Sequence, residues 1–425
     1  MSRPVGYQCS LCGAQYAPGQ VEYVCSRHGD GGNLDIVLDL QRISHETSPT
    51  SIAASGDGSL WRYLPLLPVD DPGFLGTPLR AAGWTPLYHA QRLGAALGLA
   101  NVFVKDDGRN PTASFKDRAS AVVVARAREI GASVVVTAST GNAGAALAGM
   151  AGAVGLPAVI LAPETAPPAK VAQLLIFGAR VLLVRGNYDQ AFDLCLEASR
   201  AFGWYCRNTG YNPFTAEGKK TAGFEICEQL TAWRRPAGAG WAAPDRIFVS
   251  VGDGNIISGI HKGLKDLAAL GWIDRLPKLM GVQAAGSAAV ANAWAAGTET
   301  ITPVASQTLA DSIAVDLPRD GVRAVRAVRD TGGAYLTVTD DEILSAIAAL
   351  GRHAAIFAEP AGAAAYAGLV KAVQLGLVRS DETIVVLNTG SGLKDIRAAA
   401  RAAPDPIVIE PSLDTLKQVI ANAKW

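Results

Sequence analysis

The 425-residue sequence lacks net charge, because 38 lysines and arginines balance 38 aspartates and glutamates. Charged residues are few, at 18% of the chain, and aromatic residues make up only 7%. A balanced charge gives no general attraction to nucleic acid or to an anionic membrane surface, so neither is expected as a partner. No short-period repeat is visible, which argues against a solenoid or a repeat array.

Long apolar segments of the membrane-spanning or secretory kind are also missing. The start, MSRPVGYQCSLCGAQY, has no apolar stretch of the sort found in secretory signals, so we expect a cytoplasmic protein. The uncharged stretch from Gly141 to Pro163 is rich in Ala and Gly and is interrupted by Pro157. It is interpreted as a helix, a turn and a buried strand, and not as a membrane span.

Cysteine is scarce, and half of the six cysteines follow no pattern. The scattered ones are interpreted as buried thiols in a reducing compartment; they are Cys195, Cys206 and Cys227. The other three form a pattern with a histidine: Cys9-x-x-Cys12, twelve further residues, then Cys25-x-x-His28. Two such knuckles place three sulfurs and one imidazole around a tetrahedral zinc ion, and a closed four-ligand site of this kind is structural. The alternative is a small ribbon over residues 9–28 that holds no metal.

Continuous apolar runs alternate with Ala/Leu-rich helical stretches from Trp61 onward. Such runs stand at SVVVTA (133–138), PAVILA (157–162), ARVLLVR (179–185), RIFVSV (246–251) and TIVVLN (383–388), after a shorter one in LDIVLDL (34–40). Apolar strands that alternate with helices are typical of parallel sheets covered on both faces. The sequence therefore predicts an α/β fold with doubly wound parallel sheets.

Three of these runs end in loops of small polar residues. VVVTA leads into STGNAG, IFVSV into GDGN, and IVVLN into TGSGLKD. In open parallel sheets, ligands bind beyond the carboxyl ends of the strands. We therefore expect the three loops to form the walls of one shared site.

The loop at 250–263, SVGDGNIISGIHKG, has the features of an anion site. Gly252 and Gly254 let the backbone approach a ligand closely, and free N–H groups at the start of the following helix suit a phosphate. It is neither a Walker loop nor a dinucleotide fingerprint, because no GK[ST] follows and the G-x-G-x-x-G spacing fails. The alternative is a tight strand-to-helix turn without a ligand.

The two other loops carry hydroxyl and amide side chains. In STGNAG, the Ser139, Thr140 and Gly141 segment is expected to hold a substrate carboxylate, and Asn142 to hydrogen-bond a phenolic or carbonyl oxygen. The alternative there is an ordinary helix cap. In TGSGLKD, Thr389 offers a neutral hydroxyl that meets a ring nitrogen without protonating it.

Lys116 completes the set. It stands in NPTASFKDRAS, between Phe115 and Asp117, where the Asn110-Pro111 turn holds it in place. A lysine that forms an imine needs a fixed, partly desolvated position so that its amine is available as a nucleophile. The alternative is a lysine in the first turn of a helix, paired with Asp117. A phosphate cradle, a carboxylate loop, a ring-nitrogen hydroxyl and a sheltered lysine together indicate a pyridoxal-phosphate site for an amino acid.

A series of motifs in order resembles a known family. WRYLPLLP, WTPL, KDDGRNPTASFKDR, STGNAG, EGKKTAGFEI, GVQA, FAEPAGAA and TGSGLKD follow one another between about residues 60 and 400. Together they resemble threonine synthase and its relatives, the fold-type II pyridoxal-phosphate enzymes, which are similar in fold to the tryptophan synthase β chain. The Cys-rich leader resembles the extension found on many members.

The resemblance implies an organisation and a set of roles. It implies an extension over 1–60, a large cofactor domain over 61–118 plus 213–400, a small α/β domain over 119–212, a tail over 401–425, and a homodimer. Lys116 would form the Schiff base with pyridoxal phosphate and then move protons, while Asn142 and Thr389 would meet the cofactor ring. The cofactor phosphate would be held by Gly252, Asp253, Gly254, Asn255 and Ile256, and the substrate by Ser139, Thr140, Gly141, Asn212, Lys219 and Lys220.

Threonine synthases convert O-phospho-L-homoserine and water to L-threonine and phosphate, and two residues depart from their pattern. The family carries Asn-Pro-x-Arg-x-Glu-Gly as a phosphate clamp, whereas this chain reads NPFTAEG, with Thr215 in place of arginine. Ser391 stands where the family often has histidine. Losing a guanidinium–phosphate contact is not conservative. The cations that would compensate are Lys219, Lys220, Arg207 and Arg109.

Two other activities therefore stay open alongside the threonine synthase interpretation. A serine/threonine dehydratase, or another β/γ-elimination or replacement enzyme on a non-phosphorylated amino acid, would need Lys116 and the carboxylate loop but no phosphate clamp. A non-catalytic protein on the same fold, binding through the ribbon, is the third interpretation. The intact Lys116 argues against it, because nothing structural demands lysine there.

Overall fold

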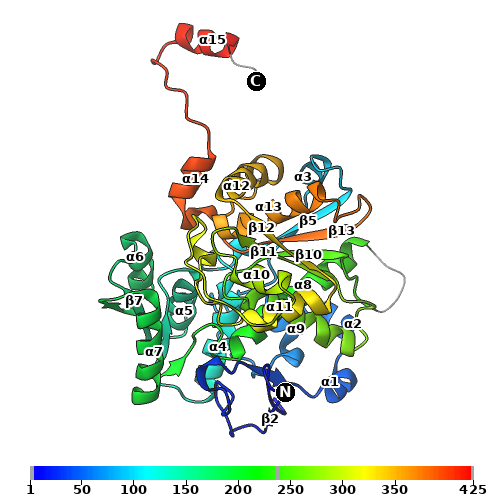
Figure 1. Cartoon of the computed structure of the whole chain (residues 1–425), viewed down its shortest axis with the longest axis vertical. Coiled ribbons are helices and arrows are strands. Elements are labelled where there is room, and N and C mark those ends of the chain that lie inside the picture. Colours follow the sequence, from blue (N-terminus) through cyan, green and yellow to red (C-terminus); the bar gives the residue numbers. More distant parts are fainter. Residues whose placement is uncertain (1–3, 235–239, 423–425) are drawn as a thin grey trace.

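The computed structural model describes residues 4–234 and 240–422 (Figure 1). Three sheets organise this part of the chain. The N-terminal sheet is antiparallel, in the order β2-β1-β3, and consists of β1 (Gly6–Cys9), β2 (Gln15–Tyr16) and β3 (Leu34–Val37). The short helix η1 (Gly29–Gly31) lies between β2 and β3, and the helices α1 (Leu40–Glu46), α2 (Pro49–Ala53) and η2 (Leu60–Leu66) follow β3.

The large sheet has six strands, in the order β12-β11-β10-β13-β5-β4. Its strands are β4 (Leu87–His89), β5 (Asn101–Asp106), β10 (Arg246–Ser250), β11 (Lys278–Ala284), β12 (Ala334–Val338) and β13 (Thr383–Asn388). All pairs are parallel except β4 with β5 at one edge. The small sheet is fully parallel, in the order β8-β7-β6-β9, with β6 (Val135–Ala138), β7 (Ala158–Pro163), β8 (Arg180–Val184) and β9 (Tyr205–Cys206). The predicted parallel α/β architecture is confirmed.

Helices cover both faces of the large sheet because successive strand residues point to opposite sides. Ile384 and Val386 of β13 pack with α3 (Gln91–Ala95), α12 (Asp340–Ala354) and α13 (Pro360–Gln374). Val385 and Leu387 belong to the other core cluster. The helices of that second layer are α8 (Phe214–Arg234), α9 (Asn255–Ala269), α10 (Ala289–Ala295) and α11 (Gly321–Asp330). Both faces of the strand are therefore buried, which is why the sequence there is apolar without alternation.

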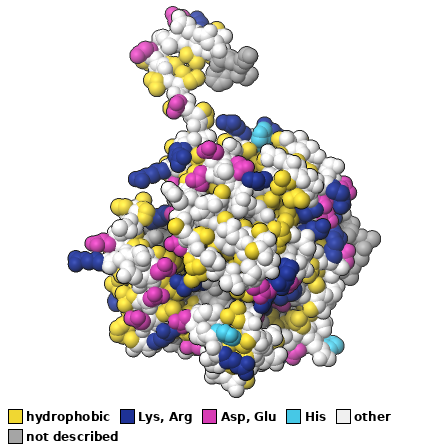
Figure 2. Space-filling view, viewed as in Figure 1, with side chains coloured by type: hydrophobic (Ala, Val, Ile, Leu, Met, Phe, Trp, Pro, Cys, Tyr) yellow, Lys and Arg dark blue, Asp and Glu magenta, His cyan; other side chains and the backbone are white. Residues whose placement is uncertain are grey.

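The remaining helices pack near the small sheet, end the chain or form short turns beside the large sheet. They are α4 (Lys116–Glu129), α5 (Asn142–Gly152), α6 (Pro168–Ile176), α7 (Tyr188–Phe202), α14 (Ile396–Ala402) and α15 (Leu413–Asn422), with the short turns η3 (Asp107–Arg109), η4 (Asp311–Ile313) and η5 (Gly392–Lys394). Figure 1 shows α15 standing away from the body on an extended segment, and Figure 2 shows the same projection with charges of both signs mixed over the visible face of the body. Among the described helices, none is long and apolar enough to cross a membrane.

The N-terminal extension packs against both α/β bodies. The Tyr23 ring stacks on Tyr211 at 4.8 Å between centroids, and its hydroxyl accepts a hydrogen bond of 3.1 Å from the N–H of Cys206, which ends β9. On the other side, Arg323 of α11 donates to Asp35 of β3 at 2.6 Å. The extension thus contacts β9 of the small sheet and helix α11 of the large one.

Candidate active site

A cavity of about 380 Å³ lies where the carboxyl ends of β6, β10 and β13 meet the starts of α4, α5 and α9. This volume is within the range of sites for small molecules. Most of the predicted site residues line it: Lys116, Ser139, Thr140, Gly141, Asn142, Lys219, Gly252, Asp253, Gly254, Asn255, Ile256 and Thr389. The expectation that the three strand-end loops share one site agrees with this arrangement.

Two residues predicted to bind substrate lie outside this lining. The Asn212 side chain donates to the carbonyl of Cys206 at 2.7 Å and accepts from the N–H of Phe214 at 2.9 Å, so it shapes the turn that begins α8. Lys220 pairs with Glu217 at 2.7 Å and with Asp266 at 2.9 Å. Both side chains have structural partners in the described part of the chain.

Lys116 is the first residue of α4 and lies next to the loop that follows β13. The N–H of Phe115, the residue before it, donates to the carbonyl of Thr389 at 2.9 Å and joins the two segments. Asp117 accepts a 2.6 Å hydrogen bond from the N–H of Thr112, so it closes the preceding turn instead of pairing with Lys116. Burial, and then the nearby Arg207 charge, lower the pKa of Lys116, which raises the fraction of free amine available for imine formation.

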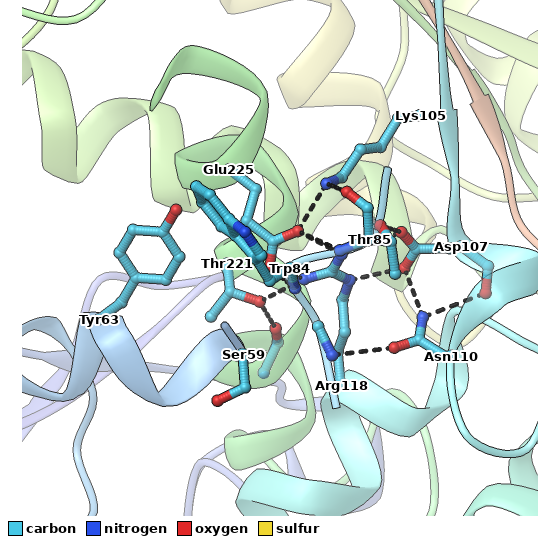
Figure 3. A network of polar contacts seen from close by, with 12 residues as sticks. Ser59, Tyr63, Trp84, Thr85, Lys105, Asp107, Asn110, Arg118, Thr221 and Glu225 are labelled. Atoms are coloured by element: carbon cyan, nitrogen blue, oxygen red, sulfur yellow. Dashed lines mark hydrogen bonds and ion pairs between the residues drawn. The ribbon is translucent and has the colours of Figure 1, made fainter. Parts of the chain in front are cut away.

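The start of α4 is anchored by a buried group of charges (Figure 3). Arg118 donates to Asp107 through Nε at 2.6 Å and Nη2 at 2.9 Å, and to Glu225 through Nη1 at 2.5 Å and Nη2 at 2.8 Å. Lys105 of β5 also donates to Glu225, at 2.6 Å. The guanidinium therefore joins α4, η3 and α8 two residues from Lys116, and Lys105 connects β5 to the same carboxylate.

The Asn110 turn is part of the same network. Its side-chain oxygen accepts from the N–H of Gly83 at 2.9 Å, and its amide nitrogen donates to the Asp107 carbonyl at 3.1 Å. Asn110 therefore holds the loop that leads into Lys116, as the sequence predicts for the Asn-Pro turn.

The loop after β10 forms a cradle that only glycine permits. Gly254 has a φ of +92°, and a Cβ there would lie 2.7 Å from the carbonyl oxygen of Asp320. A Cβ on Gly252 would lie 2.9 Å from the Cα of Ile313. The 15-residue helix α9 begins at Asn255, so its unpaired N–H groups lie at this cradle. A phosphate group fits this donor set, and with Lys116 across the cavity the residues fit pyridoxal phosphate.

The cradle is supported from behind by side chains. The Asn255 amide nitrogen donates to Asp320 at 2.7 Å, and its oxygen accepts from the Lys219 ammonium. Asp320 in turn accepts from Asn33 of the extension at 3.0 Å and from Arg323 at 2.6 Å. A chain of hydrogen bonds therefore connects the N-terminal extension to the cradle.

Glu359 is a site residue to which sequence reasoning assigned no role. It is buried, lines the cavity, and accepts two hydrogen bonds from the Asn142 amide nitrogen at 2.9 and 3.0 Å. Burial raises the pKa of its carboxyl, while the Asn142 hydrogen bonds and the Lys116 charge lower it. The FAEPAGAA motif contains this residue, but only the folded chain brings it to Asn142.

The four predicted metal ligands come together in the extension. The ligand atoms of Cys9, Cys12, Cys25 and His28 all lie within 4.8 Å of one another. The Cys12 and Cys25 sulfurs are 4.0 Å apart, and the His28 Nδ1 is 3.4 Å from the Cys25 sulfur. Separations of this size suit a tetrahedral zinc ion with Zn–S bonds of about 2.3 Å. Burial alone would raise the pKa of Cys25, but hydrogen bonds from Tyr16 and His28 lower it to about 6, which favours the thiolate a metal requires.

Comparison with known proteins places the chain in a family. A model of the pyridoxal-phosphate dependent enzymes matches residues 79–390. The threonine synthase of Methanocaldococcus jannaschii is 39% identical over 415 residues, which cover 97% of this chain and 98% of that protein. The chain belongs to the threonine synthase family. The threonine synthase of Synechocystis sp., with 36% identity over 88% of this chain and 93% of its own length, is a further relative.

Solved structures agree with the fold of this family. The processed form of threonine deaminase isoform 2 from Solanum lycopersicum superimposes with a TM-score of 0.65 at 25% identity, covering 82% of this chain and 94% of that one. Maize serine racemase gives a TM-score of 0.61 at 22% identity, covering 80% and 92% respectively, and shows the fold alone. The predicted fold-type II architecture and the predicted resemblance to threonine synthase are both confirmed, and the chain is a pyridoxal-phosphate-dependent enzyme.

Proposed function

We propose that the protein converts O-phospho-L-homoserine and water to L-threonine and phosphate, as a carbon–oxygen lyase acting on phosphates. The observation that carries this proposal is the cavity in which Lys116, an anion cradle and a carboxylate loop meet, in a chain whose full-length relatives are named threonine synthases. Pyridoxal phosphate, when bound, forms an imine with an amine and withdraws electrons from the α-carbon of an amino acid.

Lys116 is proposed as the catalytic residue. Its amine, held in a cavity that lowers its pKa, takes the α-proton and then a β-proton of the substrate. Loss of the β-proton allows the γ-phosphate to leave, and the lysine then returns a proton to the γ-carbon, which becomes the methyl group of threonine. Water adds its hydroxyl group at the β-carbon, its remaining proton leaves with the phosphate, and a last proton goes back to the α-carbon. Proton movement at neighbouring carbons needs one base that reaches each of them, and the lysine side chain is long enough for this.

Binding of the cofactor and of the amino acid is assigned to the three loops. The N–H groups of the segment from Gly252 to Ile256 would hold the cofactor phosphate, and Asn142 and Thr389 would meet the ring. The Ser139-Thr140-Gly141 segment, at the start of α5, would hold the substrate carboxylate through hydroxyl and N–H donors. All of these residues line the same cavity.

Thr215 favours a second candidate function, an elimination on a non-phosphorylated hydroxy-amino acid. Its hydroxyl donates to the carbonyl of Asn212 at 2.7 Å, so position 215 supplies no positive charge for a substrate phosphate. The decisive experiment is proton NMR of the cofactor-loaded enzyme in D₂O with O-phosphohomoserine. Threonine and inorganic phosphate must appear with wild type and not with Lys116→Ala. Untouched O-phosphohomoserine, together with α-proton exchange or elimination on serine or threonine, would favour the second function.

A structural zinc ion is proposed for the Cys9, Cys12, Cys25 and His28 cluster, with all four positions filled by protein ligands and none left for chemistry. Gly32 supports the assignment, because a Cβ there would lie 2.7 Å from the Cβ of Cys25. Metal analysis of protein expressed in defined medium should find one zinc per chain. The same stoichiometry in Cys25→Ser would contradict the assignment.

A cytoplasmic homodimer is proposed as the working form, with domains over 61–118 plus 213–400 and 119–212. Apolar side chains exposed on α6 and β8 offer surface for a second copy; they are Leu175, Ile176, Leu182 and Leu183. Light scattering coupled to gel filtration would measure the mass, and a monomer at micromolar concentration would exclude the dimer.

A further inference from the structure

We propose that Arg207 binds the γ-phosphate of the substrate and so replaces the arginine absent at position 215; this inference rests on the proposed function. Four cations were candidates for this role, and the structure separates them by their partners. Lys220 is paired with Glu217 and Asp266, as described above. Arg109, in η3, is exposed and is not part of the cavity lining.

Lys219 lies at the cofactor cradle. Its ammonium donates to the side-chain oxygen of Asn255, the first residue of α9, and Thr215 contacts the same oxygen at 3.3 Å. Lys219 thus stands beside the N–H groups that suit the cofactor phosphate. We therefore assign Lys219 to the cofactor phosphate, and a different cation is needed for the phosphate of the substrate.

Arg207 is buried, lines the cavity, and is held only by neutral groups. Its Nε donates to the Ser120 hydroxyl at 3.2 Å and its Nη1 to the Thr209 hydroxyl at 2.6 Å. Its Nη2 is buried without a hydrogen-bond partner, and no carboxylate pairs with the guanidinium in the described part of the chain. Burial lowers the pKa of Arg207 to about 10, so the side chain stays charged at neutral pH. A buried, unpaired guanidinium is costly, and an anionic ligand in the cavity would relieve that cost.

The position of Arg207 favours the substrate's phosphate over that of the cofactor. Arg207 follows β9, and its N–H donates to the carbonyl of Val136 on β6 at 2.8 Å. The next residues after β6 are Ser139 and Thr140, which begin the proposed carboxylate loop. Arg207 therefore stands on the small sheet beside the substrate loop, whereas the cradle follows β10 of the large sheet. A substrate whose carboxylate is held by the loop after β6 would therefore have its phosphate near the Arg207 guanidinium, which follows the neighbouring strand β9.

The test compares Arg207→Met and Arg207→Lys with the matched control Arg126→Met, an arginine of α4 outside the cavity that pairs with Glu129. For Arg207→Met we expect kcat/KM on O-phosphohomoserine to fall ~10–100-fold, since charge-assisted contacts are the strong ones. Inhibition by inorganic phosphate should weaken by a similar factor. Arg207→Lys should be intermediate, and Arg126→Met should stay within about twofold of wild type.

Two further measurements distinguish a phosphate site from a folding defect and from a cofactor site. Pyridoxal-phosphate affinity should be unchanged in Arg207→Met. The variant should keep α-proton exchange of unphosphorylated L-2-aminobutyrate in D₂O, with the pH profile moved to higher pH, because burial and then the Arg207 charge lower the pKa of Lys116. Unchanged kcat/KM in that variant would overturn the inference while leaving the proposed function intact. Weaker cofactor affinity with unchanged KM would overturn it in favour of the cofactor phosphate.

Failure of the proposed function itself has its own signature. If wild type leaves O-phosphohomoserine untouched, inorganic phosphate is tested as an inhibitor of the L-2-aminobutyrate exchange. Inhibition in wild type that is lost in Arg207→Met would support Arg207 as the phosphate site for a different phosphorylated amino acid. Equal inhibition of the two proteins, or none, would overturn the inference.

Discussion

Replacing Arg118 with methionine should both destabilise the protein and impair cofactor binding. Met removes the guanidinium that donates to Asp107 and Glu225 and leaves both carboxylates buried, with Lys105 the cation that still contacts Glu225. Removing one partner from a buried ion pair costs about 3–5 kcal/mol. An unfolding entropy of roughly 2.1 cal/mol/K per residue makes this a fall of about 3–6 °C in Tm for a chain of this size.

The assay is thermal unfolding at fixed cofactor concentration, together with the absorbance of the imine at Lys116. Arg118→Met should lower both the Tm and the imine absorbance, because Arg118 anchors the first turn of α4, which begins at Lys116. Arg118→Lys should recover part of the Tm, since one ammonium keeps the charge but cannot form two forked pairs. The stability of the wild-type protein should depend on pH through Glu225. Burial alone would raise the pKa of Glu225, but the charges of Arg118 and then Lys105 lower it to about 2. Its stabilisation is present above about pH 4.5 and is lost as the pH falls toward 2.

The matched control is Arg246→Met. Arg246 forms a buried forked pair with Glu382, at 2.6 and 3.0 Å, at the start of β10 and away from the cavity. The Tm of Arg246→Met should fall by a comparable amount, while its imine absorbance should stay at the wild-type level. A Tm of Arg118→Met within about 1 °C of wild type would refute the energetic reasoning. Equal loss of imine absorbance in the two variants would refute the idea that Arg118 positions Lys116.

Three further predictions concern pH, metal and the extension. Burial lowers the pKa of His261 to about 4, so its stabilisation is present above pH 6.5 and lost as the pH falls toward 4; His261→Gln should remove about 3 kcal/mol of that pH dependence in denaturant titrations. A strong zinc chelator should release the metal and lower the Tm of wild type, while Cys25→Ser should no longer respond; an equal response in the two proteins would contradict a zinc site. Asn33→Ala removes the donor to Asp320 and should weaken pyridoxal-phosphate affinity roughly fivefold, about 1 kcal/mol. Unchanged affinity by fluorescence titration would show that the extension does not support the cradle.

Most of the strands that could be predicted from the sequence are buried on both faces. The runs at 133–138, 157–162, 246–251 and 383–388 each contain a central strand, because a central parallel strand must be apolar throughout. The run at 179–185 also contains a strand, β8, but this strand lies at the edge of the small sheet and exposes Leu182 and Leu183. β5 was not singled out, since NVFVKD ends in two charged residues. Lys105 is buried against Glu225, which comes from a helix 120 positions further along the chain, and Asp106 accepts a hydrogen bond of 2.8 Å from the Asn388 side chain.

The sequence by itself determined the chemistry that the cavity could hold. The positions of Lys116, of the glycines at 252 and 254 and of the hydroxyl loops follow from local rules, because turns, helix starts and strand ends depend on neighbouring residues. Tertiary structure alone decided which charges are matched. Four cations near Thr215 were equivalent in the sequence; in the fold, Lys220 meets two carboxylates, while Arg207 is buried against hydroxyls with one nitrogen unsatisfied. Charge pairing depends on contacts between distant segments, and no local pattern contains them.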